Sequence, residues 1–202
     1  MRVLELAKYA ETKTVFMSHS RLDTNGMNFF NRAFSSTPNR CFWYSFEIPE
    51  PPHANTLTNQ IKQSSSVFVV LSEPMAERPQ TRSWVGFEAG VAASLKKSVI
   101  VFERYDEFIN IPVPGATAYI QRPPTLKDAS LEASYPYLDV CDNGGTSLKF
   151  HRQSLGSMFT HKLVECKNKD CRAKYALVLW HGQETWHCPV CRKSMKLNDK
   201  DE

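Results

Sequence analysis

The chain has 202 residues, an ordinary apolar content of 42% and a net charge of +4 at pH 7. This length suffices for one full domain and a small appendage, and the mild basicity does not predict a dedicated nucleic-acid binder. No apolar run approaches the roughly 20 residues that span a bilayer, and residues 1–8 lack the apolar core of a secretory signal, so we expect a cytoplasmic protein with no membrane partner.

Strands alternate with helices as far as residue 121. Short apolar, β-prone runs predict strands, and amphipathic runs between them predict helices. The predicted strands are residues 14–18, 40–44, 66–72, 98–102 and 117–121. The predicted helices are residues 27–34, 56–64 and 82–94, with loops at 46–55 and 73–81. The alternation predicts an α/β fold of the flavodoxin-like type, a parallel five-stranded sheet with helices on both faces.

The predicted helix at 82–94 carries two candidate site residues. Ser83 is a candidate N-cap, because its hydroxyl can accept from a first-turn amide. Trp84 and Glu88 are four residues apart and share a face. An aromatic ring beside a carboxylate suits a ligand that stacks and offers hydroxyls. The alternative is that Trp84 belongs to the core and Glu88 to a solvated face.

The middle of the chain is punctuated by proline and glycine. Helices are predicted at 126–134 and 148–163, and they either close the first domain or link it to the next. We therefore expect three parts: a domain at 1–125, a linker or helical extension at 126–162, and a small module at 163–202.

Four of the six cysteines have metal-ligand spacing. Cys166-x4-Cys171 and Cys188-x2-Cys191 are separated by sixteen residues. Two pairs on short turns let four thiolates converge tetrahedrally, as Zn²⁺ requires. The spacing predicts a zinc ribbon whose Zn²⁺ is structural, because four Cys ligands leave no open coordination position. About forty residues cannot build an adequate core alone, so the metal would supply folding energy. The alternative is four unligated structural cysteines.

Basic residues accompany the predicted ribbon, and a solvated face is the simplest interpretation of them. A surface for a partner, for self-association or for nucleic acid is the alternative. These residues are Arg172, Lys174, Arg192, Lys193 and Lys196.

Up to about residue 120, five motifs in order resemble a Toll/interleukin-1 receptor (TIR) domain of the prokaryotic type. A first strand ends in Ser-His and is followed by an acidic residue, a proline-bearing segment stands in the place of the family's BB loop, and a central strand ends in Ser. A Ser-Trp-x-x-x-Glu helix and a further strand follow. The matching residues are 15–20 with Asp23, 46–55, 68–72, 83–88 and 98–102.

The resemblance implies a reaction and a site. Many TIR domains of this type cleave NAD between nicotinamide and ribose. Glu88 would be the catalytic carboxylate and Trp84 an aromatic wall for the substrate, and Phe16, Ser18 and His19 would line the same cleft. Nicotinamide leaves as a neutral molecule, so one carboxylate that stabilises an oxocarbenium-like ribosyl cation suffices. For His19 the alternative is a cap on backbone groups of the loop.

The resemblance further implies an NAD glycohydrolase or an ADP-ribose cyclase that makes a signalling nucleotide in antiviral defence, as in Thoeris-type systems. Its partners would be NAD, other copies of the TIR domain and a separate effector protein. Two alternatives stay open: a non-catalytic TIR scaffold or adaptor, and a nucleoside deoxyribosyltransferase with one carboxylate on a similar sheet. Whether the product is linear or cyclic, what triggers activity, and what the ribbon contacts are not decided by the sequence.

Overall fold

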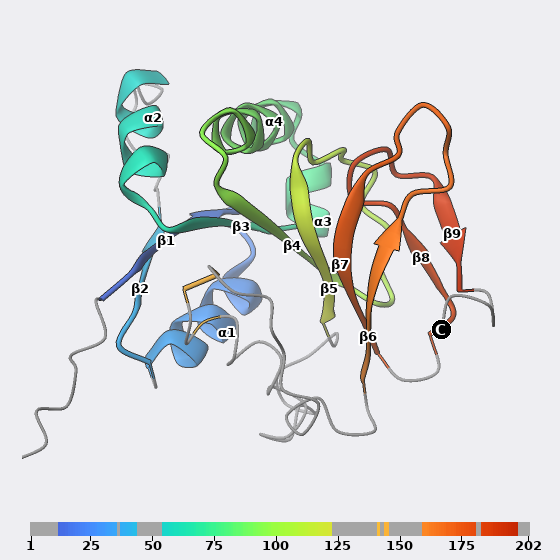
Figure 1. The fold of residues 1–202 in the computed structure, drawn as a ribbon. Coiled ribbons are helices and arrows are strands. Elements are labelled where there is room, and N and C mark those ends of the chain that lie inside the picture. Colours follow the sequence, from blue (N-terminus) through green and yellow to red (C-terminus); the bar gives the residue numbers. More distant parts are fainter. Residues whose placement is uncertain are drawn as a thin grey trace, which may run out of the picture.

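The computed structural model describes residues 12–35, 37–43, 54–122, 141, 144–145, 159–180 and 183–197. In this part of the chain, one sheet of seven strands runs in the order β2-β1-β3-β4-β5-β7-β6 (Figure 1). Its strands are β1 (Thr14–Ser18), β2 (Arg40–Trp43), β3 (Ser66–Val70), β4 (Ser98–Arg104), β5 (Ala116–Arg122), β6 (Phe159–Glu165) and β7 (Lys174–Trp180). Two short strands, β8 (Thr185–His187) and β9 (Ser194–Lys196), form a separate antiparallel pair.

The first five strands of this order are all parallel to their neighbours. The order β2-β1-β3-β4-β5 is that of a flavodoxin-like sheet, in which ligands bind at the carboxyl ends of the strands. The predicted fold class is therefore confirmed for this part. β3 is buried along its whole length, as its unbroken apolar run indicates.

Helices cover both faces of the sheet (Figure 1). On one face lie α2 (Ala54–Gln63) and α4 (Pro79–Ser94), whose apolar residues share a core with Phe16 and Val67. On the other lies α1 (Thr24–Ser35), which packs against Val15 and Met17. Adjacent strand residues thus contribute to opposite cores, as pleating requires.

The segment between β3 and β4 differs from the sequence expectation. The predicted loop at 73–81 contains a short helix, α3 (Glu73–Ala76), and the first turn of α4. α4 begins at Pro79, so the prediction that Ser83 is its N-cap is wrong. Proline suits the first helical position because its φ is already helical and its missing amide would have no partner there. Ser83 lies one turn inside, where its hydroxyl donates to the Pro79 carbonyl at 3.0 Å.

β7 and β6 extend the sheet beyond the five predicted strands. β7 pairs parallel with β5, with Ala118 opposite Ala176, and β6 pairs antiparallel with β7. The helix predicted at 148–163 is therefore wrong over residues 159–163, whose backbone groups pair with β7 instead. The helix predicted at 126–134 lies outside the described residues. The domain boundaries predicted at 125 and 163 stay predictions, although strands from either side of them are hydrogen-bonded in one sheet.

Besides the first residues of β6, the described residues of the predicted linker include Gly144 and Gly145, which lie at the amino end of β3. The carbonyl of Gly144 accepts from the hydroxyls of Ser65 and Ser66 at 2.9 and 2.8 Å. Gly145 has a φ of +69°, and a Cβ added there would lie 2.4 Å from the Ser66 hydroxyl oxygen. Among the described residues, no helix combines the length and apolar character needed to cross a bilayer.

Candidate active site and metal centre

Glu88 belongs to the buried stripe of α4. The buried residues of this helix are Val85, Glu88, Ala89 and Ala92, a spacing that defines one face. Only 2% of Glu88 is exposed. The helix therefore places a carboxylate where its neighbours in the stripe are apolar, and the alternative that Glu88 belongs to a solvated face is excluded. A carboxylate buried on an apolar helix face breaks the usual pattern of polar residues outside, and such departures are typical of functional positions.

The carboxylate of Glu88 meets the end of β1. The hydroxyl of Ser18, the last residue of that strand, donates to Glu88 Oε2 at 2.5 Å. The other oxygen, Oε1, is buried and has no hydrogen-bond partner among the described residues. Burial raises the pKa of Glu88 from 4.5 to about 7, and the hydrogen bond from Ser18 opposes this shift. A carboxyl group that changes charge near neutral pH, with one oxygen unused, is equipped to interact with a ligand.

His19 follows Ser18 and points to a different neighbour. Its ring packs edge-on against Trp43, with 4.6 Å between the ring centroids. Its Nδ1 lies 3.2 Å from the Met17 carbonyl, which can only accept, so this nitrogen carries the proton. Burial lowers the pKa of His19, although Met17 and Asp23 oppose the shift, and the imidazole is neutral at pH 7. The bond to Met17 agrees with a role in capping backbone groups, and a role in substrate binding stays a prediction.

Trp84 and Phe16 occupy unlike environments. Trp84 lies one turn before Glu88 on α4, is half-buried, and packs edge-on against Phe87 at 5.7 Å between centroids. Trp84 also packs against the apolar core that contains Val85 and Ala89. Phe16 is fully buried in the core and contacts the ring of Phe42, with 6.1 Å between centroids. Its predicted place in a cleft lining stays a prediction, and its burial anchors β1, the strand that ends in Ser18.

Ser72 is a site candidate that was not selected from the sequence. It follows β3 at the same edge of the sheet as Ser18, and only 3% of it is exposed. It stands before α3 but makes no capping hydrogen bond, and its hydroxyl has no partner among the described residues. Its place near the carboxyl end of a buried parallel strand is the signal that could have found it.

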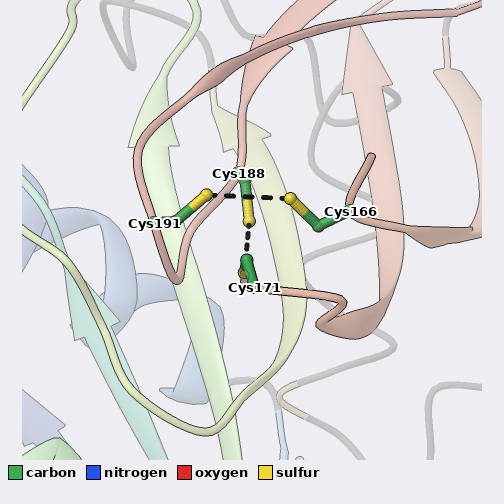
Figure 2. Close-up of side chains that lie close together, drawn as sticks. All are labelled: Cys166, Cys171, Cys188 and Cys191. Atoms are coloured by element: carbon green, nitrogen blue, oxygen red, sulfur yellow. Dashed lines mark hydrogen bonds between the residues drawn. The ribbon is translucent and has the colours of Figure 1, made fainter. Parts of the chain in front are cut away.

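The four predicted metal ligands lie together in a compact cluster (Figure 2). Their sulfur atoms are all within 4.8 Å of one another. The Cys166 and Cys191 sulfurs are 3.7 Å apart, and those of Cys171 and Cys188 are 3.9 Å apart. A tetrahedral ion with bonds of about 2.3 Å separates its ligand sulfurs by about 3.8 Å. The cluster thus has the dimensions of a four-thiolate metal site, and all four cysteines are free of disulfides.

Each half of this cluster is a turn of the same form. The first turn joins β6 to β7 and the second joins β8 to β9. Each ends in an arginine with a left-handed backbone, Arg172 at φ +50° and Arg192 at φ +59°. The amides of these residues donate to Asn168 and Cys188 at 3.1 and 2.8 Å. A left-handed arginine costs about 1–2 kcal/mol, so the surrounding turn must stabilise it.

The four-cysteine cluster shares an apolar core with α4. Cys166 and Cys188 are buried in one apolar cluster with Val85 and Ala89 of α4. In addition, the amide of Val113, before β5, donates to the Pro189 carbonyl at 2.8 Å. The cysteine turns therefore share the apolar core on the α4 face of the sheet, and the second turn is hydrogen-bonded to the segment before β5.

Comparisons with known proteins leave the family of the chain undecided. No protein-family model matches it, and no curated protein matches it. Among solved structures, the TIR domains of the activated Roq1 resistosome, which directly recognises the pathogen effector XopQ, are similar with a TM-score of 0.34 and 15% identity. The match covers 46% of this chain and 58% of the other. Similarity at this level decides no function.

Proposed function

We propose that the protein is a TIR-type enzyme that cleaves NAD at the bond between nicotinamide and ribose. The observation that carries this proposal is the buried carboxyl group of Glu88. It is held by Ser18 at the carboxyl edge of a parallel sheet and keeps one oxygen free of hydrogen bonds to described residues. The order of the motifs along the chain supports the same family.

The proposed chemistry needs little from the protein. As the bond to the pyridinium nitrogen breaks, its electron pair stays with nicotinamide, which leaves as a neutral molecule without protonation. The ribose carbon becomes positively charged, and the Glu88 carboxylate stabilises that charge in a site of low polarity. Ser18 holds one carboxylate oxygen, so that Oε1 can face the ribose. Trp84, which is half-buried one turn before Glu88, supplies an aromatic ring that stacks on a ring of the substrate.

The same site can give two kinds of product. Attack by water on the ribose cation gives ADP-ribose, and attack by a nucleophile of the same nucleotide gives a cyclic product. We propose that either product serves as a signal in antiviral defence, read by a separate effector protein, and that the TIR domain self-associates. The ion of the four-cysteine cluster is then a structural Zn²⁺.

Turnover of NAD tests this proposal directly. Purified full-length protein should release nicotinamide from NAD in amounts that exceed the enzyme many-fold, and mass spectrometry would identify the second product. The assay should extend from dilute to concentrated protein, because self-association predicts that activity per molecule rises with concentration. Absence of turnover at every concentration would favour the scaffold, and turnover of deoxynucleosides in place of NAD would favour a deoxyribosyltransferase.

The pH dependence of the reaction should report the ionisation of Glu88. Because the carboxylate and not the acid stabilises a cation, kcat/KM is expected to rise with pH through the pKa of this group, about 7. The profile of kcat/KM is the appropriate measurement, since it reflects the free enzyme. A flat profile between pH 5 and 9 would contradict the assignment.

Ser18→Ala provides the matched variant for that profile. The Ser18 hydroxyl donates to the carboxylate and lowers the pKa of Glu88, so its removal should move the midpoint to higher pH. Thr81 lies about two turns before Glu88 on α4, and the hydrogen bond of the carboxylate is to Ser18, so Thr81→Ala gives a control. If the midpoint moved equally in both variants, the hydrogen bond between Ser18 and Glu88 would not be what sets the midpoint of the kcat/KM profile.

A further inference from the structure

A buried carboxylate near the carboxyl end of β4 joins the first domain to the cysteine turns. Only 1% of Glu103 is exposed. Its Oε1 accepts from the amide of Ile109 at 2.9 Å and from Arg192 Nη2 at 2.5 Å. Its Oε2 accepts from the Tyr119 hydroxyl at 2.6 Å. One side chain thus connects β4, β5, the loop between them and the second cysteine turn.

The β4–β5 loop (residues 105–115) touches the second cysteine turn at two further points. The Phe108 and His187 rings lie 3.9 Å apart between centroids, and the Arg192 guanidinium lies 5.2 Å over the Phe108 ring. At the other end of the loop, the Val113 amide donates to the Pro189 carbonyl. The loop therefore takes its position from the turn and from Glu103.

The conformation of Arg192 depends on the cysteine turn. Arg192 directly follows Cys191, has the left-handed backbone described above, and is 5% exposed. An ion bound by Cys188 and Cys191 would hold both ends of this turn and so stabilise the arginine where it meets Glu103. Without the arginine, the Glu103 carboxylate would be a buried charge lacking its counter-ion, which is strongly unfavourable.

The same loop begins at the edge of the sheet where the candidate active site is, and it ends at the opposite edge, where β5 starts. β1, β3 and β4 are parallel, so their carboxyl ends share one edge. The Leu71 amide donates to the Phe102 carbonyl at 2.8 Å, which sets Glu103 near the level of Ser72. The loop that follows β4 is therefore a neighbour of the residues that follow β1 and β3.

We propose that the four-cysteine centre is a brace for this edge: the loaded centre holds Arg192 on Glu103 and thereby orders the β4–β5 loop, and loss of the ion releases that loop. The brace lies beside the proposed NAD site, but its action is defined by the order of the loop and not by turnover. Its failure and the failure of the proposed function can therefore be told apart.

Hydrogen exchange in two glycine variants of the full chain tests the brace. Arg192→Gly keeps the left-handed backbone without strain and removes only the side chain. Arg172→Gly is the matched control, because Arg172 has the same place in the other turn but is 64% exposed and contacts Glu165 at 3.7 Å. The amides of Ile109 and Val113 should exchange at least about ten-fold faster in Arg192→Gly, with bound metal retained, and remain as in wild type in Arg172→Gly. Equal protection of the loop in both variants would overturn the proposal.

Chelation of the wild-type protein gives a second measurement that needs no variant to fold. Metal content and exchange would be followed together as the ion is removed. The expected result is that the Ile109 and Val113 amides lose protection in proportion to the ion lost, and by a larger factor than the amides of the buried strand β3. Loop amides that stay protected in protein shown to be metal-free would overturn the brace, whether or not the protein cleaves NAD.

Discussion

Glu88→Gln is expected to reduce nicotinamide release from NAD by about 10³-fold while raising the stability of the fold at alkaline pH. The loss of turnover follows because the amide cannot stabilise the ribosyl cation by charge, and removal of one preorganised electrostatic group typically costs two to three orders of magnitude. Glutamine has nearly the shape of glutamate and can still accept from Ser18, so the site is otherwise retained. Steady-state assays with NAD at pH 8 measure the effect.

The stability effect follows from the buried carboxyl group. Its pKa is about 7 in the folded protein and 4.5 as the ordinary value, so the folded state binds the proton more tightly. Below pH 4.5 the group is protonated in both states and costs nothing. Between pH 4.5 and 7 the stability of wild type falls, and above pH 7 the full penalty of about 3 kcal/mol is present. Glutamine removes this penalty.

Thermal melts at two pH values distinguish these effects from a general disturbance. At pH 8 the variant should melt roughly 5–10 °C above wild type, and the difference should vanish near pH 4.5. Glu77→Gln, at an exposed position just before α4, is the matched control and should change neither turnover nor the pH dependence of melting. A Glu88→Gln protein that retains turnover would remove Glu88 from the mechanism, and one that melts below wild type at pH 8 would contradict the buried charge.

Cys188→Ser is expected to remove the bound metal and to destabilise the main sheet together with the cysteine turns. The side chain is fully buried in the core cluster that also contains Val85 and Ala89 of α4. Metal binding to a four-thiolate site is itself folding free energy, and serine does not replace a thiolate ligand. We expect a loss of at least about 5 kcal/mol, a large part of the 5–15 kcal/mol that stabilises a typical domain.

Cys41→Ser is the matched control for this variant. Cys41 is a half-buried cysteine of β2, outside the metal cluster. Its replacement should leave metal content and the melting temperature almost unchanged. The decisive measurement combines metal analysis with circular dichroism during thermal unfolding. A Cys188→Ser protein that loses metal but melts like wild type would show that the cysteine turns contribute nothing to the stability of the sheet.

Local patterns were sufficient for the parts of the fold that depend on neighbours in the chain. The apolar runs at 14–18 and 66–72 predict buried strands because such runs can be satisfied only between covering layers, and both strands are present. The cysteine spacing predicts the metal cluster because short turns confine each pair of thiolates. Glu88 could be selected because a carboxylate near Trp84 matched a family motif.

Other features depend on groups that meet only after folding. Ser83 has a hydroxyl that could cap a helix, but α4 already begins at Pro79, four residues earlier. The local sequence at 159–163 predicts a helix, and only the pairing with β7, a strand eleven or more residues further on, makes this segment a strand. The contact between Arg192 and Glu103 joins residues 89 positions apart, and no local pattern indicates it.

By itself, the sequence determined the alternation of strands and helices, the four-cysteine cluster and the identity of one unusual carboxylate. Local hydrophobicity and short spacings act within a few residues, so they are readable without a fold. The tertiary structure alone decided that Ser18 donates to Glu88, that the cysteine turns share the main core, and that β7 pairs with β5. These are hydrogen bonds and packing contacts between residues far apart in the sequence. Their partners depend on the spatial order of the strands in the sheet, which no local pattern indicates.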